Sequence, residues 1–208
     1  MDEKNDIKKT LLVLDGFAII FRVFYSRQPM SNSKGIPTTI AQGFLSILFK
    51  LIKEVNPTNI ILAMDSKGPT FRHESYPEYK AGRDPAPPEL TEQIPILEKV
   101  IKSFSIPMYS ADRYEADDVI ASLVELASGK NILISTLDKD LAQLVTPKVH
   151  LINTMHNKLL DSEAVEEKFG VRPEQMRDYL ALIGDRSDNV PGITGVGPKT
   201  AAKWLGLY

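Results

Sequence analysis

Acidic side chains gather in one short stretch near the middle of the chain. Glu115, Asp117 and Asp118 lie within four residues, directly before an apolar pattern typical of a helix. Glu115 and Asp118 are three residues apart, so the spacing predicts that they share a helix face while Asp117 points elsewhere. Acidic residues are favoured in the first turn of any helix, so this stretch alone is better explained as an ordinary helix start. Its chemistry depends on whether other carboxylates join it.

Three more aspartates follow short apolar runs of the kind that form buried parallel strands. The runs and their aspartates are residues 10–14 with Asp15, 59–64 with Asp65, and 131–137 with Asp138. Helical patterns separate the runs, and this βαβ rhythm predicts a mostly parallel sheet with helices on both faces. Ligands of such sheets bind beyond the carboxyl ends of the strands. One such aspartate is best explained as a helix cap, but three of them beside the central acids predict a shared site.

Further carboxylates extend this set toward the end of the chain. Asp140 follows two residues after Asp138, and Asp185 and Asp188 come just after a helix predicted at 173–183. In isolation the last pair would indicate an Asx-turn. The nine candidate metal ligands are Asp15, Asp65, Glu115, Asp117, Asp118, Asp138, Asp140, Asp185 and Asp188.

Nine carboxylates in one place would repel one another unless they take up protons or bind cations. All-oxygen ligands select Mg²⁺ or Mn²⁺. Zinc is disfavoured, because the chain has no cysteine and its three histidines show no ligand spacing. So many acids predict two or more ions in a two-metal site that hydrolyses phosphodiesters. One ion would lower the pKa of a bound water and another would hold the leaving oxygen, so no protein nucleophile is required.

A basic, aromatic and turn-rich segment lies between Asp65 and the central acids. Residues 67–83 interleave Lys and Arg with Phe and Tyr, which suits a phosphate backbone with stacked bases. An ordinary solvated loop explains the same composition equally well. Setting the nine acids aside turns the formal net charge of −2 into +7 for the rest of the chain. A basic body around an acidic hole is what a nuclease acting on a polyanion would need.

A glycine-rich turn precedes the last predicted helix. Backbone N–H groups around Gly192, Gly195 and Gly197 can cradle a phosphate, and the helix dipole and Lys199 add positive charge. The spacing is not that of a dinucleotide-binding fingerprint, and no strand precedes it. A plain glycine-rich turn is the alternative, and the lysines of the following helix favour phosphate binding.

Length and composition set broad bounds. The 208 residues suffice for one large domain or one and a half, and 43% hydrophobic residues can build a sizeable core. The chain has no run of eighteen apolar residues, and its first nine residues are too polar for a signal peptide. We therefore expect no membrane partner. The absence of cysteine fits a reducing, cytoplasmic location, and a monomer is the default expectation.

The ordered motifs of the chain resemble those of the 5′-nuclease domain of bacterial DNA polymerase I, in the flap-endonuclease family. The resemblance covers nearly the whole chain. Its motifs are Leu14–Gly16 with Arg22, Asp65 with Thr70–Glu74, Tyr79–Arg83, Glu115–Ile120, Asp138–Val145, and Gly184–Gly197.

This resemblance implies an α/β flap-nuclease (PIN-like) core in residues 1–160 with an arch-like insertion at about 66–92. A helical DNA-binding segment, the start of a helix–three-turn–helix, would occupy 161–208. The implied activity is that of a metal-dependent 5′–3′ exonuclease and 5′-flap endonuclease, bacterial and nucleoid-associated. Its partners would be DNA with a 5′ end or flap and, in a longer parent chain, a polymerase domain. A K⁺ ion would bind at the glycine-rich turn. The nine acids would hold the metals, the catalytic residues would be Lys80, Arg83 and Arg22, and the DNA-binding residues would be Arg72, Tyr79, Gly192, Gly195, Gly197 and Lys199.

Two departures from the family pattern leave alternatives open. Leu137 stands where the family usually has Gly, and it would distort the placement of Asp138 if that position needs a positive φ or a close backbone approach. The chain also ends eleven residues after Gly197, so we expect a fragment or a shortened relative with a weak grip on duplex DNA. A structure-specific DNA-binding protein with little catalysis is therefore the second hypothesis.

Two further alternatives are weaker. The duplex-gripping segment argues against a single-stranded RNA nuclease. An aspartyl-phosphate phosphatase is disfavoured because no second Asp lies two residues after Asp15.

Overall fold

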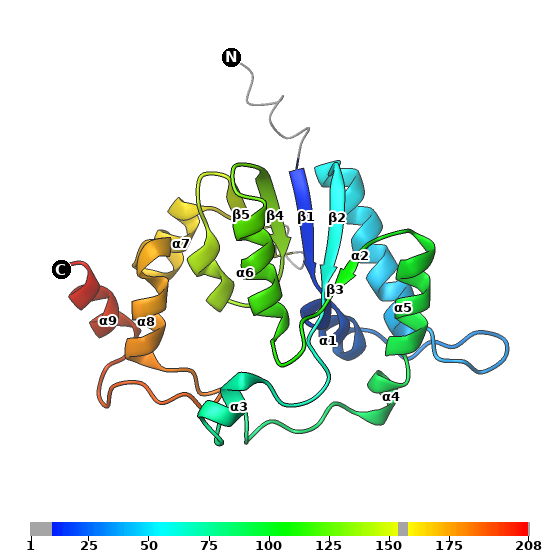
Figure 1. Ribbon diagram of the computed structural model, residues 1–208, viewed down its shortest axis with the longest axis horizontal. Coiled ribbons are helices and arrows are strands. Elements are labelled where there is room, and N and C mark those ends of the chain that lie inside the picture. The colour runs from blue at the N-terminus through cyan, green and yellow to red at the C-terminus, as the bar shows by residue number, and fades with distance from the viewer. Residues whose placement is uncertain (1–9, 154–157, 208) are drawn as a thin grey trace, which may run out of the picture.

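A six-stranded sheet lies at the centre of the computed structural model (Figure 1), which describes residues 10–153 and 158–207. Residues 1–9, with which the predicted 1–160 domain begins, lie outside the described residues, as do 154–157 and 208. The strand order is β3-β2-β1-β4-β5-β6, and every neighbouring pair is parallel except β5 with β6. The strands are Thr10–Asp15 (β1), Asn59–Ala63 (β2), Met108–Tyr109 (β3), Asn131–Ser135 (β4), Val149–Asn153 (β5) and Lys158–Leu160 (β6). The predicted mostly parallel sheet is confirmed.

The central strand β1 explains why the sheet needs cover on both faces. Every residue of β1 is buried, and its side chains alternate between two hydrophobic clusters. Leu12 and Leu14 belong to one cluster, and Leu11 and Val13 belong to the other.

Helices supply that cover on both faces, as predicted. The cluster around Leu12 and Leu14 includes side chains of Gly16–Ser26 (α1), Thr39–Val55 (α2) and Ile94–Ser103 (α5). The cluster around Val13 includes side chains of Ala116–Leu126 (α6), Ser162–Phe169 (α7), Met176–Ile183 (α8) and Pro198–Leu205 (α9). None of the helices in the described ranges combines the length and apolar character needed to cross a membrane.

Short elements connect the longer helices and strands. They are Phe71–Ser75 (α3), Pro88–Thr91 (α4) and the 3₁₀ turns Asp140–Leu144 (η2) and Pro173–Gln175 (η3). Figure 1 shows α3, in the segment that follows Asp65, lying beyond the carboxyl ends of the strands. The basic segment therefore runs past the edge at which the predicted site lies.

The structure adds detail that the sequence patterns did not supply. The apolar segment after Asp15 is helix α1, which aromatic side chains make apolar on most of its surface. The helix predicted at 173–183 is split, with the 3₁₀ turn η3 before α8. Strand β6 is a three-residue antiparallel edge strand that no alternating pattern marked.

Candidate active site

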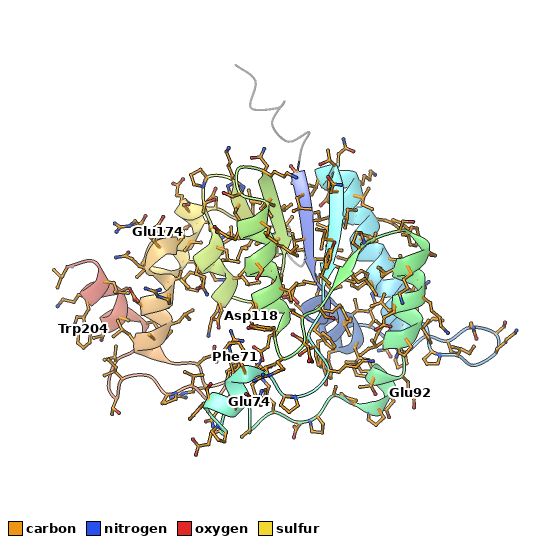
Figure 2. The ribbon with its side chains drawn as sticks, in the orientation of Figure 1. Phe71, Glu74, Glu92, Asp118, Glu174 and Trp204 are labelled. Atoms are coloured by element: carbon orange, nitrogen blue, oxygen red, sulfur yellow. The ribbon has the colours of Figure 1, made fainter. Side chains whose placement is uncertain are left out.

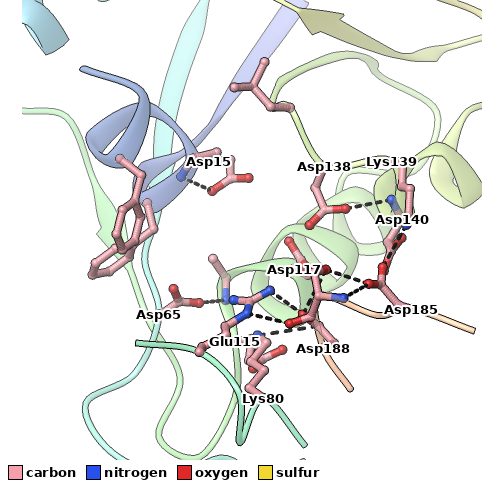
Figure 3. A pocket seen from close by; sticks show the side chains of 17 residues that line it. Asp15, Asp65, Lys80, Glu115, Asp117, Asp138, Lys139, Asp140, Asp185 and Asp188 are labelled. Carbon is pink, nitrogen blue, oxygen red and sulfur yellow. Dashed lines mark hydrogen bonds and ion pairs between the residues drawn. The ribbon is translucent and has the colours of Figure 1, made fainter. Parts of the chain in front are cut away.

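Eight of the nine predicted acids line one pocket at the carboxyl ends of the strands (Figure 3). Parallel strands place Asp15 and Asp65 there, and loops and the start of α6 bring the others. The pocket also includes basic residues (Lys80, Arg83 and Lys139) and exposes apolar atoms of Phe17, Phe21 and Leu137. The eight acids are Asp15, Asp65, Glu115, Asp117, Asp138, Asp140, Asp185 and Asp188.

Some of these acids also form hydrogen bonds at helix starts. The same carboxylate can therefore cap a helix and line the pocket. Asp15 accepts a hydrogen bond from the N–H of Ala18 and caps α1. Asp65 accepts one from the N–H of Ala116 at 2.6 Å, at the start of α6. Because each carboxylate is tied to a helix start, its direction is fixed by the fold.

The central acids are arranged differently from the predicted face-sharing of Glu115 with Asp118. Glu115 is the residue before the helix, and Asp118 reaches back to accept the Glu115 N–H at 3.0 Å, completing a capping box. Helical spacing therefore does not set the direction of Glu115, and Glu115 enters the pocket together with Asp117.

Asp118 is placed outside this pocket lining. Its two oxygens accept hydrogen bonds from the guanidinium of Arg72 at 2.7 and 2.8 Å. Figure 2 shows Asp118 at the end of α6 that faces α3, where Phe71 is drawn. Burial alone would raise the pKa of Asp118, but the hydrogen bonds from Arg72 and from the Glu115 N–H, together with the charges of Arg72 and Lys80, lower it. Among the described contacts, this carboxylate anchors the basic segment to α6.

The pocket crowds negative charge, which raises the pKa of several carboxyl groups. Burial, and then the nearby charges of Asp138 and Asp15, raise the pKa of Asp117 to about 8. Burial is also the main cause that raises the pKa of Asp15 and of Asp140 to about 6. Without bound cations, these three carboxyl groups keep a proton to higher pH than an exposed aspartate does, and Asp117 is mostly protonated at pH 7.

Lysine and arginine side chains of the basic segment neutralise part of the negative charge in the pocket. The Lys80 ammonium lies 2.6 Å from a Glu115 oxygen, and the Arg83 guanidinium pairs with Asp188. Tyr79 is buried, and its hydroxyl lies 2.9 Å from a Glu115 oxygen and 3.0 Å from an Asp188 oxygen, so its single proton serves one of the two carboxylates at a time. These contacts draw the predicted catalytic pair Lys80 and Arg83 directly onto the acids.

The loop after α8 brings Asp185 into the pocket through a turn that needs glycine. Gly184 has a φ of +71°, and an added Cβ would lie 2.3 Å from the nitrogen of Gly192. The Asx-turn is present, because the Ser187 N–H donates to Asp185 at 2.7 Å. Lys139 pairs with Asp185 at 2.8 Å. Although burial opposes them, these hydrogen bonds lower the pKa of Asp185 to about 2.

The remaining predicted residues are not part of the pocket lining. Arg22 is on α1 and is not part of the pocket lining. Gly192 is explained by close packing, because its Cβ would meet the backbone of Ile183, whereas the space around Gly195 and Gly197 is open. Lys199 lies in the first turn of α9.

The donor set suits a hard divalent cation. The pocket offers carboxylate oxygens, and Oδ1 of Asp140 is buried with no hydrogen-bond partner in the described structure. No ready-formed group of three or more ligating side chains occurs among the described residues. Several of the acids point instead at Lys80, Arg83 and Lys139, so a bound ion would have to compete with these ion pairs.

Sequence reasoning missed three residues that help to build the pocket. Lys139 lies between two predicted ligands, and its position in the Asp-Lys-Asp triplet was the available signal. Thr136 donates to Asp15, and Phe17 contributes an apolar wall. Neither residue carries a motif that separates it from ordinary core positions.

Leu137 does not produce the distortion that its replacement of glycine suggested. The described residues with a positive φ do not include it. Its side chain is 42% exposed at the pocket, and the neighbouring Asp138 N–H still bonds to Thr136.

Comparison with known proteins places the chain in a family of nucleases. The family model for the 5′-3′ exonuclease N-terminal resolvase-like domain matches residues 10–170, and the model for the 5′-3′ exonuclease C-terminal SAM fold matches residues 171–208. The chain belongs to the 5′-3′ exonuclease family, whose members are nucleases that act on phosphodiester bonds.

Individual relatives agree with this assignment. A 5′-3′ exonuclease of Aquifex aeolicus is 46% identical over 202 residues, covering 96% of this chain and 70% of the relative. DNA polymerase I of Bacillus subtilis is 40% identical over 204 residues, covering 95% of this chain and 23% of the polymerase. The chain thus spans less than a quarter of that polymerase, and the match carries no polymerase activity.

Solved structures confirm the fold. T5 5′-exonuclease with bound divalent zinc ions has a TM-score of 0.79 at 25% identity, covering 96% of this chain and 76% of that one. The T5 D15 flap endonuclease, solved with DNA and metal ions, has a TM-score of 0.78 at 25% identity, covering 96% and 75%. Flap endonuclease-1 of Methanococcus jannaschii has a TM-score of 0.62 at 18% identity, covering 97% and 72%, and supports the fold alone.

Proposed function

We propose that this chain uses divalent metal ions to hydrolyse DNA phosphodiesters, as a 5′–3′ exonuclease and 5′-flap endonuclease. The observation that carries the proposal is the gathering of eight carboxylates from separate segments in one pocket. Membership of the 5′-3′ exonuclease family supports the reaction class. The metal-bound T5 relatives support the need for divalent ions.

The acids divide by position into those fixed by the strands and those carried by loops. Asp15, Asp65 and Asp117 are held by the ends of β1 and β2 and the start of α6, so they form the rigid part of the ligand set. Asp140 offers an oxygen without a partner, and Asp185 comes from the loop after α8. Two or more Mg²⁺ or Mn²⁺ ions held here would activate a water and stabilise the leaving oxygen.

Lys80 and Arg83 would change partners when DNA binds. In the described structure both neutralise acids of the pocket. Once divalent cations satisfy those acids, the ammonium and guanidinium are free to donate to the phosphate that is cut. Arg22 lies on the neighbouring helix α1, and Arg72 holds the base of the same segment against Asp118.

The DNA duplex would be gripped farther from the pocket. Gly195 and Gly197 leave open space before α9, where backbone N–H groups and Lys199 suit a phosphate. A K⁺ ion bound at this turn would add positive charge. In a bacterium, the source of the 46% identical relative, the DNA substrate of this chain would be that of the nucleoid, in the cytoplasm. The polymerase relatives support a parent chain that also carries a polymerase domain.

The test compares one pocket acid with one surface acid. Asp117→Asn keeps the shape of a pocket side chain but removes its charge, and Asp112→Asn makes the same change at an exposed position. We expect Asp117→Asn to lower cleavage of a 5′-flap duplex by at least about 100-fold and Asp112→Asn to leave it unchanged. Full activity in Asp117→Asn would refute the assignment of the site.

The second candidate function is structure-specific DNA binding without catalysis. The ion pairs that occupy Glu115, Asp185 and Asp188 favour it, because they oppose metal binding. Binding of a flap duplex by the unmodified chain without any cleavage in Mg²⁺ would support this alternative.

A further inference from the structure

Thr136 is a buried threonine at the end of β4 whose hydroxyl bonds to two different segments of the site. Its side-chain oxygen donates to Oδ2 of Asp15 at 2.7 Å and accepts the N–H of Asp138 at 3.0 Å. Thr136 and Asp15 are 6% and 5% exposed. The hydroxyl has one proton to give, so it cannot rotate away from Asp15 without losing that bond.

The position of this hydroxyl follows from the sheet. Strands β1 and β4 are parallel neighbours, and Leu14 lies opposite Ser135 in their register. The next residues of the two strands are therefore Asp15 and Thr136, side by side where the strands end. Only a side chain that both donates and accepts can join the carboxylate on one strand to the turn that leaves the other.

The hydrogen bonds form a continuous chain through three predicted metal ligands. Asp15 bonds to Thr136, Thr136 bonds to the N–H of Asp138, and Oδ1 of Asp138 accepts the N–H of Asp140 at 2.8 Å. The second oxygen of Asp15 accepts the N–H of Ala18. Each Asp15 oxygen thus has one protein partner and keeps one acceptor site for a ligand.

We infer that Thr136 is a positioning residue that sets the geometry of Asp15 and Asp138 for divalent-cation binding. The inference rests on the proposed function, because it assigns these two acids as ligands. Groups that hydrogen-bond to metal ligands fix the ligand orientation, and their loss typically weakens metal affinity about 10–100-fold. Without the hydroxyl, Oδ2 of Asp15 would lose its partner in a buried place, and the N–H of Asp138 would lose its partner in the part-buried turn that follows β4.

The competing explanation is that Thr136 only fills the core and satisfies its own hydroxyl. Valine has nearly the same shape without the hydroxyl, and serine keeps the hydroxyl without the methyl group. Thr39 provides a matched control, because it is also buried and its hydroxyl also accepts an N–H, that of Met30, at 2.8 Å. It lies in the first turn of α2, outside the pocket lining.

The experiment titrates the chelator-treated 208-residue chain with Mn²⁺ alone, without DNA, by calorimetry. We expect Thr136→Val to weaken Mn²⁺ binding at least about 10-fold and Thr136→Ser to stay within about 3-fold of the unmodified chain. Thr39→Val should lower the midpoint of thermal unfolding without changing Mn²⁺ affinity. The Mg²⁺ concentration for half-maximal cleavage should rise in Thr136→Val by a similar factor.

Three results would overturn the inference. They are unchanged Mn²⁺ affinity in Thr136→Val, equal weakening in Thr39→Val, and a Thr136→Ser variant as weak as Thr136→Val. These results leave the proposed function standing if the unmodified chain binds Mn²⁺ and cuts DNA. An unmodified chain that does not bind Mn²⁺ would overturn both.

Discussion

The Lys80 ammonium lies 2.6 Å from a carboxylate oxygen of Glu115, which joins the basic segment to the first residue of the central acidic stretch. Two predicted roles, a DNA-contacting cation and a metal ligand, thus meet in one ion pair. A second ion pair of the same kind lies beside it, because Arg83 of the basic segment pairs with Asp188. Metal binding and DNA binding are therefore expected to be coupled through these partners.

Removing the Lys80 charge should separate the two roles. In Lys80→Met, the freed Glu115 carboxylate is expected to bind Mn²⁺ as well as or better than in the unmodified chain. The rate of cleavage should nevertheless fall about 100-fold, because the cation that would neutralise negative charge on the phosphate is gone. Mn²⁺ calorimetry and single-turnover cleavage of a flap duplex measure the two effects. Lys102→Met, in the last turn of α5, is the control. Equal activity in both variants would contradict the role of Lys80.

The stability of the metal-free chain should fall as pH rises from about 5 to 8. The carboxyl groups of Asp15 and Asp140, with pKa values of about 6, and of Asp117, with a pKa of about 8, bind protons more tightly when folded than when unfolded. The folded state then holds more protons in this range, and each excess proton costs about 1.4 kcal/mol of stability per pH unit as the pH rises. Urea unfolding in chelator at pH 5.5, 7 and 8.5 measures the slope.

Two additions should flatten this pH dependence. Saturating Mn²⁺ should do so, because a cation replaces the protons among the acids. Asp117→Asn should also do so, because it removes the group with the highest pKa of the three. If the metal-free chain instead becomes more stable as the pH rises over this range, the pKa values of these carboxyl groups are not raised in the folded state.

Leu137 should not be the residue that limits activity. Because its backbone does not take a positive φ, we expect Leu137→Gly to change the cleavage rate by less than about 3-fold. The rate is measured on the same flap duplex at saturating Mg²⁺. A jump of 10-fold or more would favour the second candidate function, in which the unmodified chain binds DNA but is catalytically disabled.

Gly184 should matter for folding because of what surrounds it. In Gly184→Ala the new methyl group would lie 2.3 Å from Gly192 nitrogen and 2.6 Å from Val190 oxygen, so the turn that carries Asp185 must shift. We expect a loss of about 3 kcal/mol in the free energy of unfolding. Gly129 has a φ of +88° with open space around it, so Gly129→Ala isolates the cost of the backbone angle, about 1 kcal/mol. Similar losses in both variants would contradict the importance of the close packing.

The sequence predicted the aspartates at the strand ends well, because their position depends only on residues next to them in the chain. An apolar run that stops at an aspartate marks both a buried strand and the edge where it ends, and Asp15, Asp65 and Asp138 all reached the pocket. The sequence could not predict that Asp117 lines the pocket while Asp118 does not. This difference depends on Arg72, which is distant in sequence and hydrogen-bonds to Asp118. Thr136 was missed for a similar reason, since its role exists only once β1 and β4 are neighbours.

The measurement that tests the central claim most directly is cleavage of a 5′-labelled flap duplex by the unmodified chain. It is followed in Mg²⁺, in Mg²⁺ with excess chelator, and after Mg²⁺ is restored. We predict labelled products cut near the junction only when free Mg²⁺ is present. Equal cleavage in chelator, or no cleavage by a folded chain that binds the duplex, would contradict the account.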